Sequence, residues 1–436
     1  MQRQHYIMVI PPEFLKKFTK RVGVSDSELE VLLDTLEGED LSAIAQKLGI
    51  QRNALQKRLG EVYKKFRIEG SGPGKFAKLQ KILLEEYEKY IRQGNPDSTE
   101  SNHFQWGDVP IVSTFCDRAT ELTQAQEFLI QERFPLVAVL GMAGMGKSVF
   151  TVRLVEQIAS NYDYVIWRNL SLRSVPTLES LLTDLMRCFQ SSQESDTPPV
   201  IADLIQQLQR DRCLVILDNF ESLFQPQNFA GYYQSGYENY GELLKQITQT
   251  HHQSSLLLLS RETPLELMSL TGGTSTTPMI TLKGLTRDGI EQLLSEKGLN
   301  CQDDTIFSQL LDHYSGHPVA INELAITVQT LFAGNFNDLL QDNSIFVGEI
   351  MSHYFSQQLQ RLSPLEKEVI EHLASESLTL KEIQNSFSEN KDLSYLMAAL
   401  NSLNRRCLLE KLTDNDITRF TIIPSLKKYI SLQLQS

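Results

Sequence analysis

The chain has 436 residues, of which 41% are hydrophobic and 22% are charged, and its net charge is −13. This length exceeds what one hydrophobic core usually holds, so we expect two to four domains. The five cysteines are widely spaced without a C-x-x-C pair, which argues against a disulfide framework or a cysteine zinc site. No run reaches the roughly 18 apolar residues of a membrane span, so we expect a cytoplasmic protein with no membrane partner.

The charge is unevenly distributed along the chain. Residues 1–92 hold 17 Lys and Arg against 13 Asp and Glu, a net charge of +4, which leaves −17 for the rest. Within residues 41–81 the count is 10 basic against 2 acidic. The acidic total argues against nucleic-acid binding by the whole surface, whereas this short stretch is basic enough for it.

Residues 25–67 carry a helix-turn-helix pattern. We expect a first helix over 26–36, a second over 41–48, a turn at Gly49-Ile50 and a third helix that ends at Phe66. Apolar residues at helical spacing would form the shared core, namely Ile44, Leu48, Ile50, Leu55, Leu59 and Val62.

The sequence of residues 41–66 resembles the LuxR-type helix-turn-helix, which implies that the helix from Gln51 to Phe66 enters the major groove of duplex DNA. In that arrangement the residues facing base edges are Gln51, Arg52, Asn53, Gln56 and Lys57. Those neutralising phosphates are Arg58, Lys64, Lys65 and Arg67. Helix-turn-helix folds also dock proteins, and a run of charge is often a solvated face, so a protein-docking role stays open.

A phosphate-binding loop follows further along the chain. An apolar run over 136–140 opens into the sequence G-M-A-G-M-G-K-S over 141–148, and a helical pattern comes next. The glycines let successive backbone N–H groups converge on a phosphate, and the helix offers its positive end. Lys147 would reach the β- and γ-phosphates and Ser148 would bind Mg²⁺. The expected nucleotide contacts here are Gly141, Gly144, Met145, Gly146, Lys147, Ser148 and Val149.

Two more buried strands end in polar residues. The run over 213–217 ends in Asp218, which places a carboxylate beside the phosphate-binding loop, where it can bind Mg²⁺. The strand over 254–260 is followed by Arg261, whose guanidinium could sense the γ-phosphate. Between them, residues 222–241 form a long loop rich in aromatic residues and glycine, for which a gating or contact role and mobility without function are both open.

The remaining pattern is mostly helical. We expect a strand over 278–283 to close the sheet and helices over 288–296, 305–314 and 319–332 to follow it, and we expect His317 to be structural. A final domain begins near Phe346, with a serine cap at Ser363, further helices and a β-wing over 408–423. This is a winged-helix pattern. Because residues 363–406 hold 5 basic and 7 acidic residues, we expect a structural or regulatory module rather than a DNA reader.

The ordered set of the phosphate-binding loop, L-D-N-F-E, S-R, G-L-T and G-H-P, ending in a winged helix, resembles the NB-ARC class of STAND ATPases over residues 104–430. The resemblance implies a three-layer α/β fold whose parallel sheet is of the additional-strand type, followed by helical and winged-helix domains and preceded by the all-α helix-turn-helix domain. It implies that Gly146, Lys147, Ser148 and Asp218 bind phosphate and Mg²⁺, that Arg261 is a sensor, and that Arg118 and Pro318 lie near adenine. It also implies a closed ADP form that opens on exchange for ATP to form a homo-oligomer.

This sequence departs from the family pattern in three places. Asn219 stands where a second acid is common, and an amide cannot accept the proton of an attacking water, so Glu221 becomes the candidate base and we expect slow ATP turnover. Ile422-Ile423-Pro424 lacks the histidine that would hold the β-phosphate. No repeat of 20 to 50 residues follows, so we expect the signal to come from an unknown protein partner or from DNA.

The predicted domains are the helix-turn-helix domain over 1–92, a linker over 93–103, the nucleotide-binding domain over 104–283, a helical domain over 284–345 and the winged helix over 346–436. The leading hypothesis is a switch that couples ATP and Mg²⁺ binding to oligomerisation and to DNA binding through residues 41–81. The second is a signalling scaffold without nucleic acid, and the third is a motor-like ATPase with continuous turnover.

Overall fold

The computed structural model describes residues 12–36, 44, 47–48, 50–66, 68, 75, 78–79, 82–83, 86, 103–105, 109, 115–171, 175–189, 197–269, 277–299, 301, 303–339, 345–387, 392–414 and 417–435. The chain divides into a first unit of residues 1–101 with 112–114 and a second unit of residues 102–111 with 115–436. None of the helices among these residues has the length and apolar character needed to span a membrane.

Three helices of the first unit have defined bounds: α1 (Pro12–Arg21), α2 (Asp26–Leu36) and α4 (Arg52–Lys65). The predicted first and third helices are present, while α1 was not predicted. Of the predicted second helix, most lies outside the described residues, although Ile44 and Lys47 are helical. The predicted core forms around Val31, with Ile44, Leu55 and Leu59 buried and Leu48 and Ile50 packed against them. Val62 is buried in an adjoining cluster with Phe14 and Leu15 of α1.

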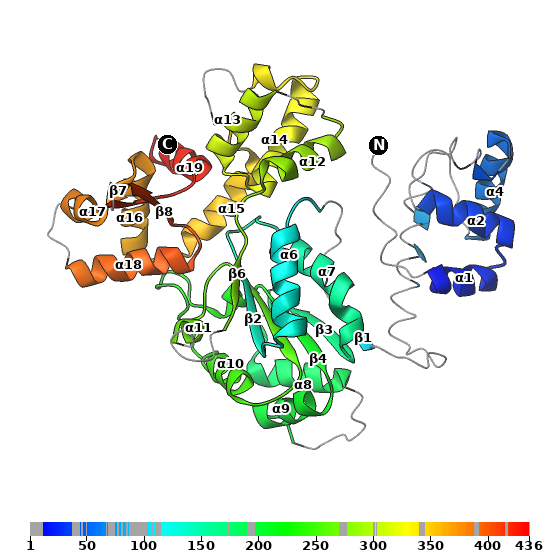
Figure 1. The fold of residues 1–436 in the computed structure, drawn as a ribbon, viewed down its shortest axis with the longest axis horizontal. Coiled ribbons are helices and arrows are strands. Elements are labelled where there is room, and N and C mark those ends of the chain that lie inside the picture. Colours follow the sequence, from blue (N-terminus) through cyan, green and yellow to red (C-terminus); the bar gives the residue numbers. More distant parts are fainter. Residues whose placement is uncertain are drawn as a thin grey trace. The chain divides into compact units, whose positions relative to one another are not determined.

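The second unit is built on a sheet of six parallel strands (Figure 1). Their spatial order is β1 (His103–Gln105), β3 (Tyr164–Asn169), β4 (Cys213–Asp218), β5 (Ser255–Ser260), β2 (Leu136–Leu140) and β6 (Met279–Thr281). The predicted strands over 136–140, 213–218, 254–260 and 278–283 are therefore confirmed. Strand β5 lies between β2 and β4, as the additional-strand type of sheet requires.

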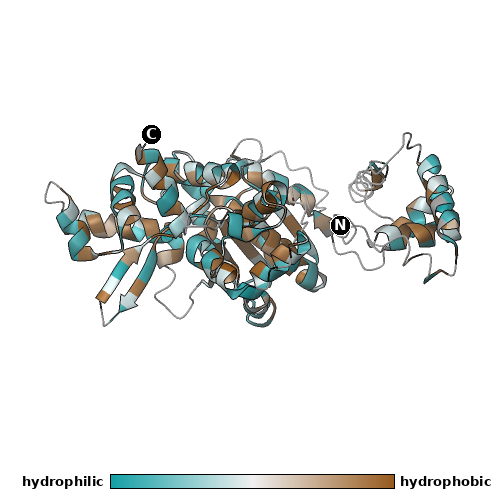
Figure 2. Ribbon diagram, turned by 90° about the horizontal axis from the view of Figure 1, so that it is seen from above, coloured by the Kyte–Doolittle hydropathy of each residue, from teal (hydrophilic) through white to brown (hydrophobic). Residues whose placement is uncertain are grey.

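Helices cover both faces of this sheet, as expected for strands that are apolar along their whole length. They are α6 (Ala119–Gln126) with its π-helical continuation to Gln131, α7 (Lys147–Ile158), α8 (Leu178–Cys188), α9 (Ile201–Arg210), α10 (Asn239–Gln249) and the short α11 (Leu265–Ser269). The central strands are brown in Figure 2, whereas the outer faces of the helices are largely teal. Every residue of β2, β4 and β5 is buried.

Seven further helices follow the sheet: α12 (Arg287–Glu296), α13 (Asp304–Tyr314), α14 (Pro318–Leu331), α15 (Glu349–Gln360), α16 (Pro364–Ser375), α17 (Leu380–Ser386) and α18 (Leu393–Arg405). A small sheet of order β7-β9-β8 and the last helix α19 (Pro424–Gln435) complete the described part. Its strands are β7 (Leu378–Thr379), β8 (Glu410–Asp414) and β9 (Ile417–Thr421). The helices and wing strands predicted after Ser363 are present, whereas α15 and β7 were not predicted.

The segment after β6 and the start of α14 meet backbone to backbone at two glycines. The N–H of Leu285 donates to the carbonyl of Gly316 at 2.7 Å. A Cβ atom on Gly284 would lie 1.7 Å from the carbonyl oxygen of Ser315, and one on Gly316 would lie 2.2 Å from that of Leu285. Gly316 also has a φ of 67°, which favours glycine. The predicted G-H-P start of α14 is thereby fixed against the end of the sheet.

The cap of α16 generates a test of local stability. Ser363 Oγ accepts from the N–H of Glu366, whose carboxylate accepts from the N–H of Ser363 at 2.8 Å. Ser363→Ala should lower the free energy of unfolding by about 1 kcal/mol, measured by chemical denaturation. The matched control is Ser375→Ala at the exposed far end of the same helix, which should stay within about 0.5 kcal/mol of the parent. Equal losses in both variants would show that the cap contributes nothing specific.

Candidate functional site

The loop between β2 and α7 has the backbone shape that its sequence predicts. Gly144 and Gly146 have φ values of 79° and 87°, and Gly146 is the N-cap of α7. A Cβ atom on Gly144 would lie 2.7 Å from His317 Cε1, so a glycine is needed both for the turn and for the approach of α14. Gly141 and Met145 are buried in the same loop, and Ser148 and Val149 begin α7 half-buried.

Lys147 is turned onto its own loop. Its Nζ donates to the carbonyls of Gly141 at 2.8 Å and of Met142 at 3.0 Å. Burial lowers the pKa of Lys147, and the nearby carboxylates of Glu221 and Asp218 oppose that change. The ammonium group therefore lies at the mouth of the loop, where a phosphate would replace the two carbonyls as its partner.

Ser148 and Asp218 form the pair that could hold a metal ion. Ser148 Oγ donates to Asp218 Oδ2 at 2.8 Å, and the N–H of Asn219 donates to Oδ1 at 2.8 Å. Burial raises the pKa of Asp218 to about 6, against the opposing hydrogen bond from Ser148. A hydroxyl and a carboxylate oxygen are ligands suited to Mg²⁺. Within the described residues no three His, Cys, Asp or Glu side chains group as a metal site. An ion held by Ser148 and Asp218 would take its remaining ligands from phosphate and water.

The candidate base and the candidate sensor are bound to each other. Glu221 lies in a short 3₁₀ turn, Phe220–Leu223, directly after β4, and is 3% exposed. Its Oε1 lies 2.7 Å from Arg261 Nε, and the N–H of Arg261 donates to its Oε2 at 3.2 Å. Burial raises the pKa of Glu221, but Arg261 and Lys147 outweigh it, so the net shift is downward. The carboxylate of Glu221 is thus ionised and already paired with Arg261.

Arg118 and the start of α14 approach the loop from the other side. Arg118 is buried and donates to the carbonyl of Lys283 at 2.5 Å, with a longer contact of 3.5 Å to the carbonyl of Met145. His317 Nε2 donates to the carbonyl of Ala143 at 2.9 Å, and Pro318 is the first residue of α14. Burial lowers the pKa of His317 to about 4, so the ring is neutral near pH 7. His317 therefore has the structural role that we expected.

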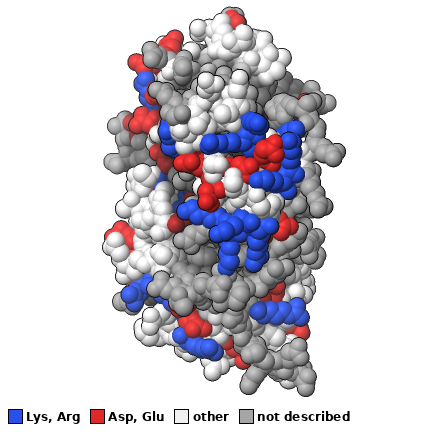
Figure 3. Space-filling view, turned by 90° about the vertical axis from the view of Figure 1, so that its right-hand side faces the viewer, with Lys and Arg blue, Asp and Glu red and all other residues white. Residues whose placement is uncertain are grey.

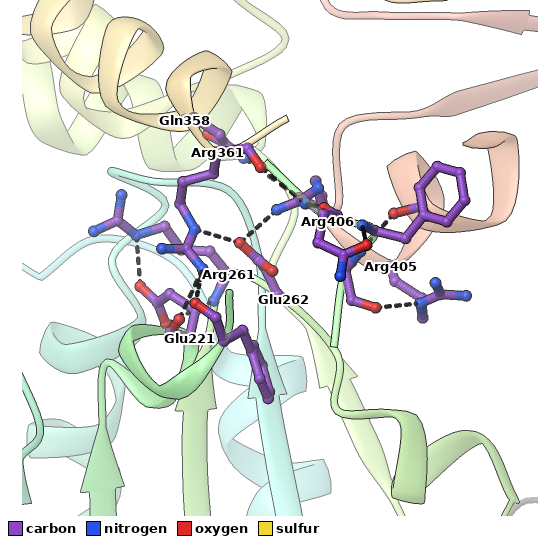
Figure 4. Close-up of polar contacts among 12 residues, drawn as sticks. Glu221, Arg261, Glu262, Gln358, Arg361, Arg405 and Arg406 are labelled. Carbon is purple, nitrogen blue, oxygen red and sulfur yellow. Dashed lines mark hydrogen bonds and ion pairs between the residues drawn. The ribbon is translucent and has the colours of Figure 1, made fainter. Parts of the chain in front are cut away.

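The C-terminal helices bring to this edge of the sheet polar residues that are not evident from the sequence (Figure 4). Gln358 and Arg361 come from α15 and its end, and Arg405 and Arg406 from the end of α18. The N–H of Ala143 in the loop donates to Gln358 Oε1 at 3.5 Å, and Arg361 Nη2 donates to the carbonyl of Glu221 at 2.8 Å. The sole hint in the sequence is the Arg405-Arg406 pair at a helix end in an acidic segment.

The long loop over 222–241 makes contacts with the same helices. Phe224 and Tyr233 form a β-bridge at its base. Near its tip the N–H of Gln227 donates to the carbonyl of Arg361 at 2.9 Å, and the N–H of Ala230 donates to Ser402 Oγ at 2.6 Å. Of the two alternatives left open for this loop, a contact role is the one that these bonds support.

Helix α4 carries the residues proposed to meet DNA. Asn53, Lys57 and Lys64 are exposed and share one face, opposite the buried Leu55 and Leu59. Gln51 is the exposed N-cap and Arg58 is half-buried on another face, while the side chains of Arg52 and Gln56 and the whole of Arg67 lie outside the described residues. Figure 3 shows Lys and Arg side chains gathered beside acidic ones. In the first unit, Lys64 pairs with Glu61 at 2.6 Å and Lys65 with Glu28 at 2.5 Å.

Comparisons with known proteins agree with this site. Residues 135–299 match the sequence model of the NACHT domain, a P-loop NTPase domain of the STAND class. An uncharacterised WD repeat-containing protein of Nostoc sp. is 33% identical over 363 residues, which cover 80% of this chain and 28% of that protein. The chain thus spans less than a third of the curated relative that it matches.

Among solved structures, the Walker-type ATPase of Pyrococcus abyssi matches with a TM-score of 0.51 at 15% identity, over 73% of this chain and 96% of that one. A STAND protein with a tetratricopeptide repeat sensor from Pyrococcus horikoshii matches with a TM-score of 0.38 at 15% identity, over 77% of this chain and 44% of that one. The first likeness shows the fold. The match of residues 135–299 to the NACHT model is what supports the resemblance to STAND ATPases at the level of the class.

The raised pKa of Asp218 predicts a pH-dependent stability. Between its ordinary pKa of 3.8 and about 6 the folded protein keeps a proton that the unfolded chain has lost, so this group makes the free energy of unfolding fall as pH rises. In protein free of nucleotide and metal, the stability of the parent relative to Asp218→Asn should fall by up to about 3 kcal/mol from pH 4 to pH 7. His317 acts in the opposite sense in both proteins and cancels in the comparison. Parallel stability curves would contradict the prediction.

Proposed function

We propose that this chain, which carries a NACHT domain of the STAND class of P-loop NTPases, is an ATP/ADP-dependent signalling switch. The observation that carries the proposal is the set of hydrogen bonds that hold the phosphate-binding loop. Residues of α14 and α15 hold the backbone of Ala143 on both its N–H and its carbonyl, while Lys147 bonds to its own loop. Such a closed form would have to loosen when a triphosphate is exchanged into the site.

In this proposal the loop N–H groups and Lys147 bind the phosphates, and Ser148 and Asp218 hold Mg²⁺. Arg118 and Pro318 would lie beside adenine. The metal ion would neutralise part of the phosphate charge. The same proposal divides this part of the chain into a nucleotide-binding domain (104–283), a helical domain (284–345) and a winged-helix domain (346–436).

Slow ATP turnover fits the arrangement better than continuous motor action. A general base must be able to accept a proton from water, whereas Glu221 is buried and bonded to Arg261. In this proposal Arg261 leaves Glu221 when it turns to a γ-phosphate. Both residues would have to separate before catalysis, so each turnover would depend on a rearrangement.

The proposed output is assembly into a homo-oligomer together with duplex DNA binding by the exposed face of α4. A partner protein of unknown identity would supply the signal. One observation favours the alternative, a scaffold that docks a protein: several basic side chains of the first unit already pair with acids, including Lys47 with Asp34 at 3.0 Å and Lys65 with Glu28. Paired cations release fewer counterions on binding DNA.

Nucleotide binding should be visible as thermal stabilisation. At a Mg·ATP concentration 100 times Kd, binding to the folded state alone adds about 2.7 kcal/mol, which raises Tm by about 5–10 °C. Lys147→Ala should lose most of this shift because the ammonium group no longer binds phosphate. Lys245→Ala, at an exposed position on α10, should keep it. Identical melting curves with and without Mg·ATP in the parent would refute nucleotide binding.

DNA binding can be tested with the full chain and a labelled duplex by fluorescence anisotropy. If α4 neutralises phosphates, the logarithm of affinity should fall steeply with the logarithm of salt, by about 0.9 per phosphate contacted. Lys57→Glu should weaken binding about tenfold or more, whereas the same charge change in Lys245→Glu should have little effect. No binding at about 50 mM salt would remove DNA as the target and favour the docking alternative.

A further inference from the structure

Two buried carboxylates flank Arg261 and differ in their partners. Glu221 pairs with Arg261 itself, as described above. Glu262, the next residue along the chain, is 2% exposed, and its Oε1 lies 2.5 Å from both Arg361 Nε and Arg406 Nη1. Its Oε2 is buried without a hydrogen-bond partner. Figure 4 shows Arg361 above Glu221 and Glu262, with Arg406 beside Glu262.

Glu262 attaches the C-terminal helices to the sheet. Arg406 is 1% exposed and also bonds to Glu366 of α16 at 2.8 Å. Backbone bonds run alongside: the N–H of Thr263 donates to the carbonyl of Arg405 at 3.0 Å. The two guanidinium groups on Glu262 are therefore the charged part of one attachment between strand β5 and the ends of α15 and α18.

Arg361 lies between the two carboxylate residues. While its Nε binds Glu262, its Nη2 donates to the backbone carbonyls of Glu221 at 2.8 Å and of Phe224 at 3.2 Å. Arg261 and Arg361 both line a cleft of about 510 Å³, together with Pro226, Gln227, Gln357 and Gln360. Their side chains are 23% and 20% exposed, and the cleft beside them leaves each room to turn.

A buried carboxylate that loses its counterion is strongly destabilised. If Arg261 turns to a γ-phosphate, Glu221 keeps its charge and needs a new partner. Arg361 already touches the backbone of Glu221, so a rotation of its side chain would supply one. Glu262 would then keep a single guanidinium, from Arg406, and the C-terminal helices would lose part of their attachment.

We propose that Glu221 and Glu262 exchange Arg361 when a triphosphate binds, and that this exchange loosens the C-terminal helices from the sheet. The proposal rests on the nucleotide switch above, because it needs Arg261 to leave Glu221 for the γ-phosphate. Arg361 is then a positioning residue. It touches no nucleotide, but its partner depends on whether a γ-phosphate is bound, and that partner determines how firmly α15 and α18 are attached to the sheet.

Hydrogen exchange measured by mass spectrometry on the full chain tests the exchange of partners. The reporters are peptides that contain Gln227 and Thr263, whose N–H groups donate to the carbonyls of Arg361 and Arg405. In the parent, Mg²⁺ with a non-hydrolysable ATP analogue should speed their exchange by about tenfold relative to ADP. Glu262→Gln should show the fast exchange without any nucleotide, and Glu242→Gln, an exposed carboxylate on α10, should behave as the parent.

Glu221→Gln is the more discriminating variant, because its neutral side chain does not attract the guanidinium group of Arg361. This variant should bind the analogue, as monitored by its thermal shift, yet keep slow exchange at both reporters. Fast exchange in Glu221→Gln with bound analogue, or slow exchange in the parent with bound analogue, would overturn the partner exchange and leave the nucleotide switch standing. Absence of any thermal shift in the parent would overturn both proposals.

Discussion

Negative charge buried at the carboxyl edge of the sheet is the constraint on which this site depends. Asp218, Glu221 and Glu262 are each no more than 3% exposed, and an uncompensated carboxylate in such a place is costly. Each is compensated in its own way. Asp218 accepts two hydrogen bonds and has a raised pKa, Glu221 holds one arginine, and Glu262 holds two. In the proposed function a nucleotide would add further negative charge at this edge, and the arginines that now pair with carboxylates, together with Lys147 near them, would have to be shared with its phosphates.

The sequence was sufficient wherever a feature is encoded locally. Strands β2, β4 and β5 are continuous apolar runs. Gly141 follows β2, Asp218 ends β4 and Arg261 follows β5, so both the strands and the functional edge that they share could be predicted. The core of the first unit followed from helical spacing in the same way, because Ile44, Leu55 and Leu59 repeat on one face. Helix α1 escaped prediction although its Phe14 and Leu15 are buried.

The attachment of the C-terminal helices could not be predicted because it is made by tertiary contacts between charged residues far apart in the chain. Arginine is among the residues least often buried, so nothing in the sequence indicates that Arg406 is 1% exposed. Residue type and position point to a base at Glu221 and a sensor at Arg261, but they do not indicate that the two side chains bind each other.

The crossing of Gly284 and Gly316 also bears on how this fold can change over time. The segment that leaves β6 and the turn that begins α14 are joined through main-chain atoms, and even one methyl group at either glycine would collide with a carbonyl oxygen. The side chains around this joint are therefore free to vary in evolution, whereas the joint itself requires glycine at both positions. Most of the surface of these helices could therefore change in evolution while this main-chain joint stays the same.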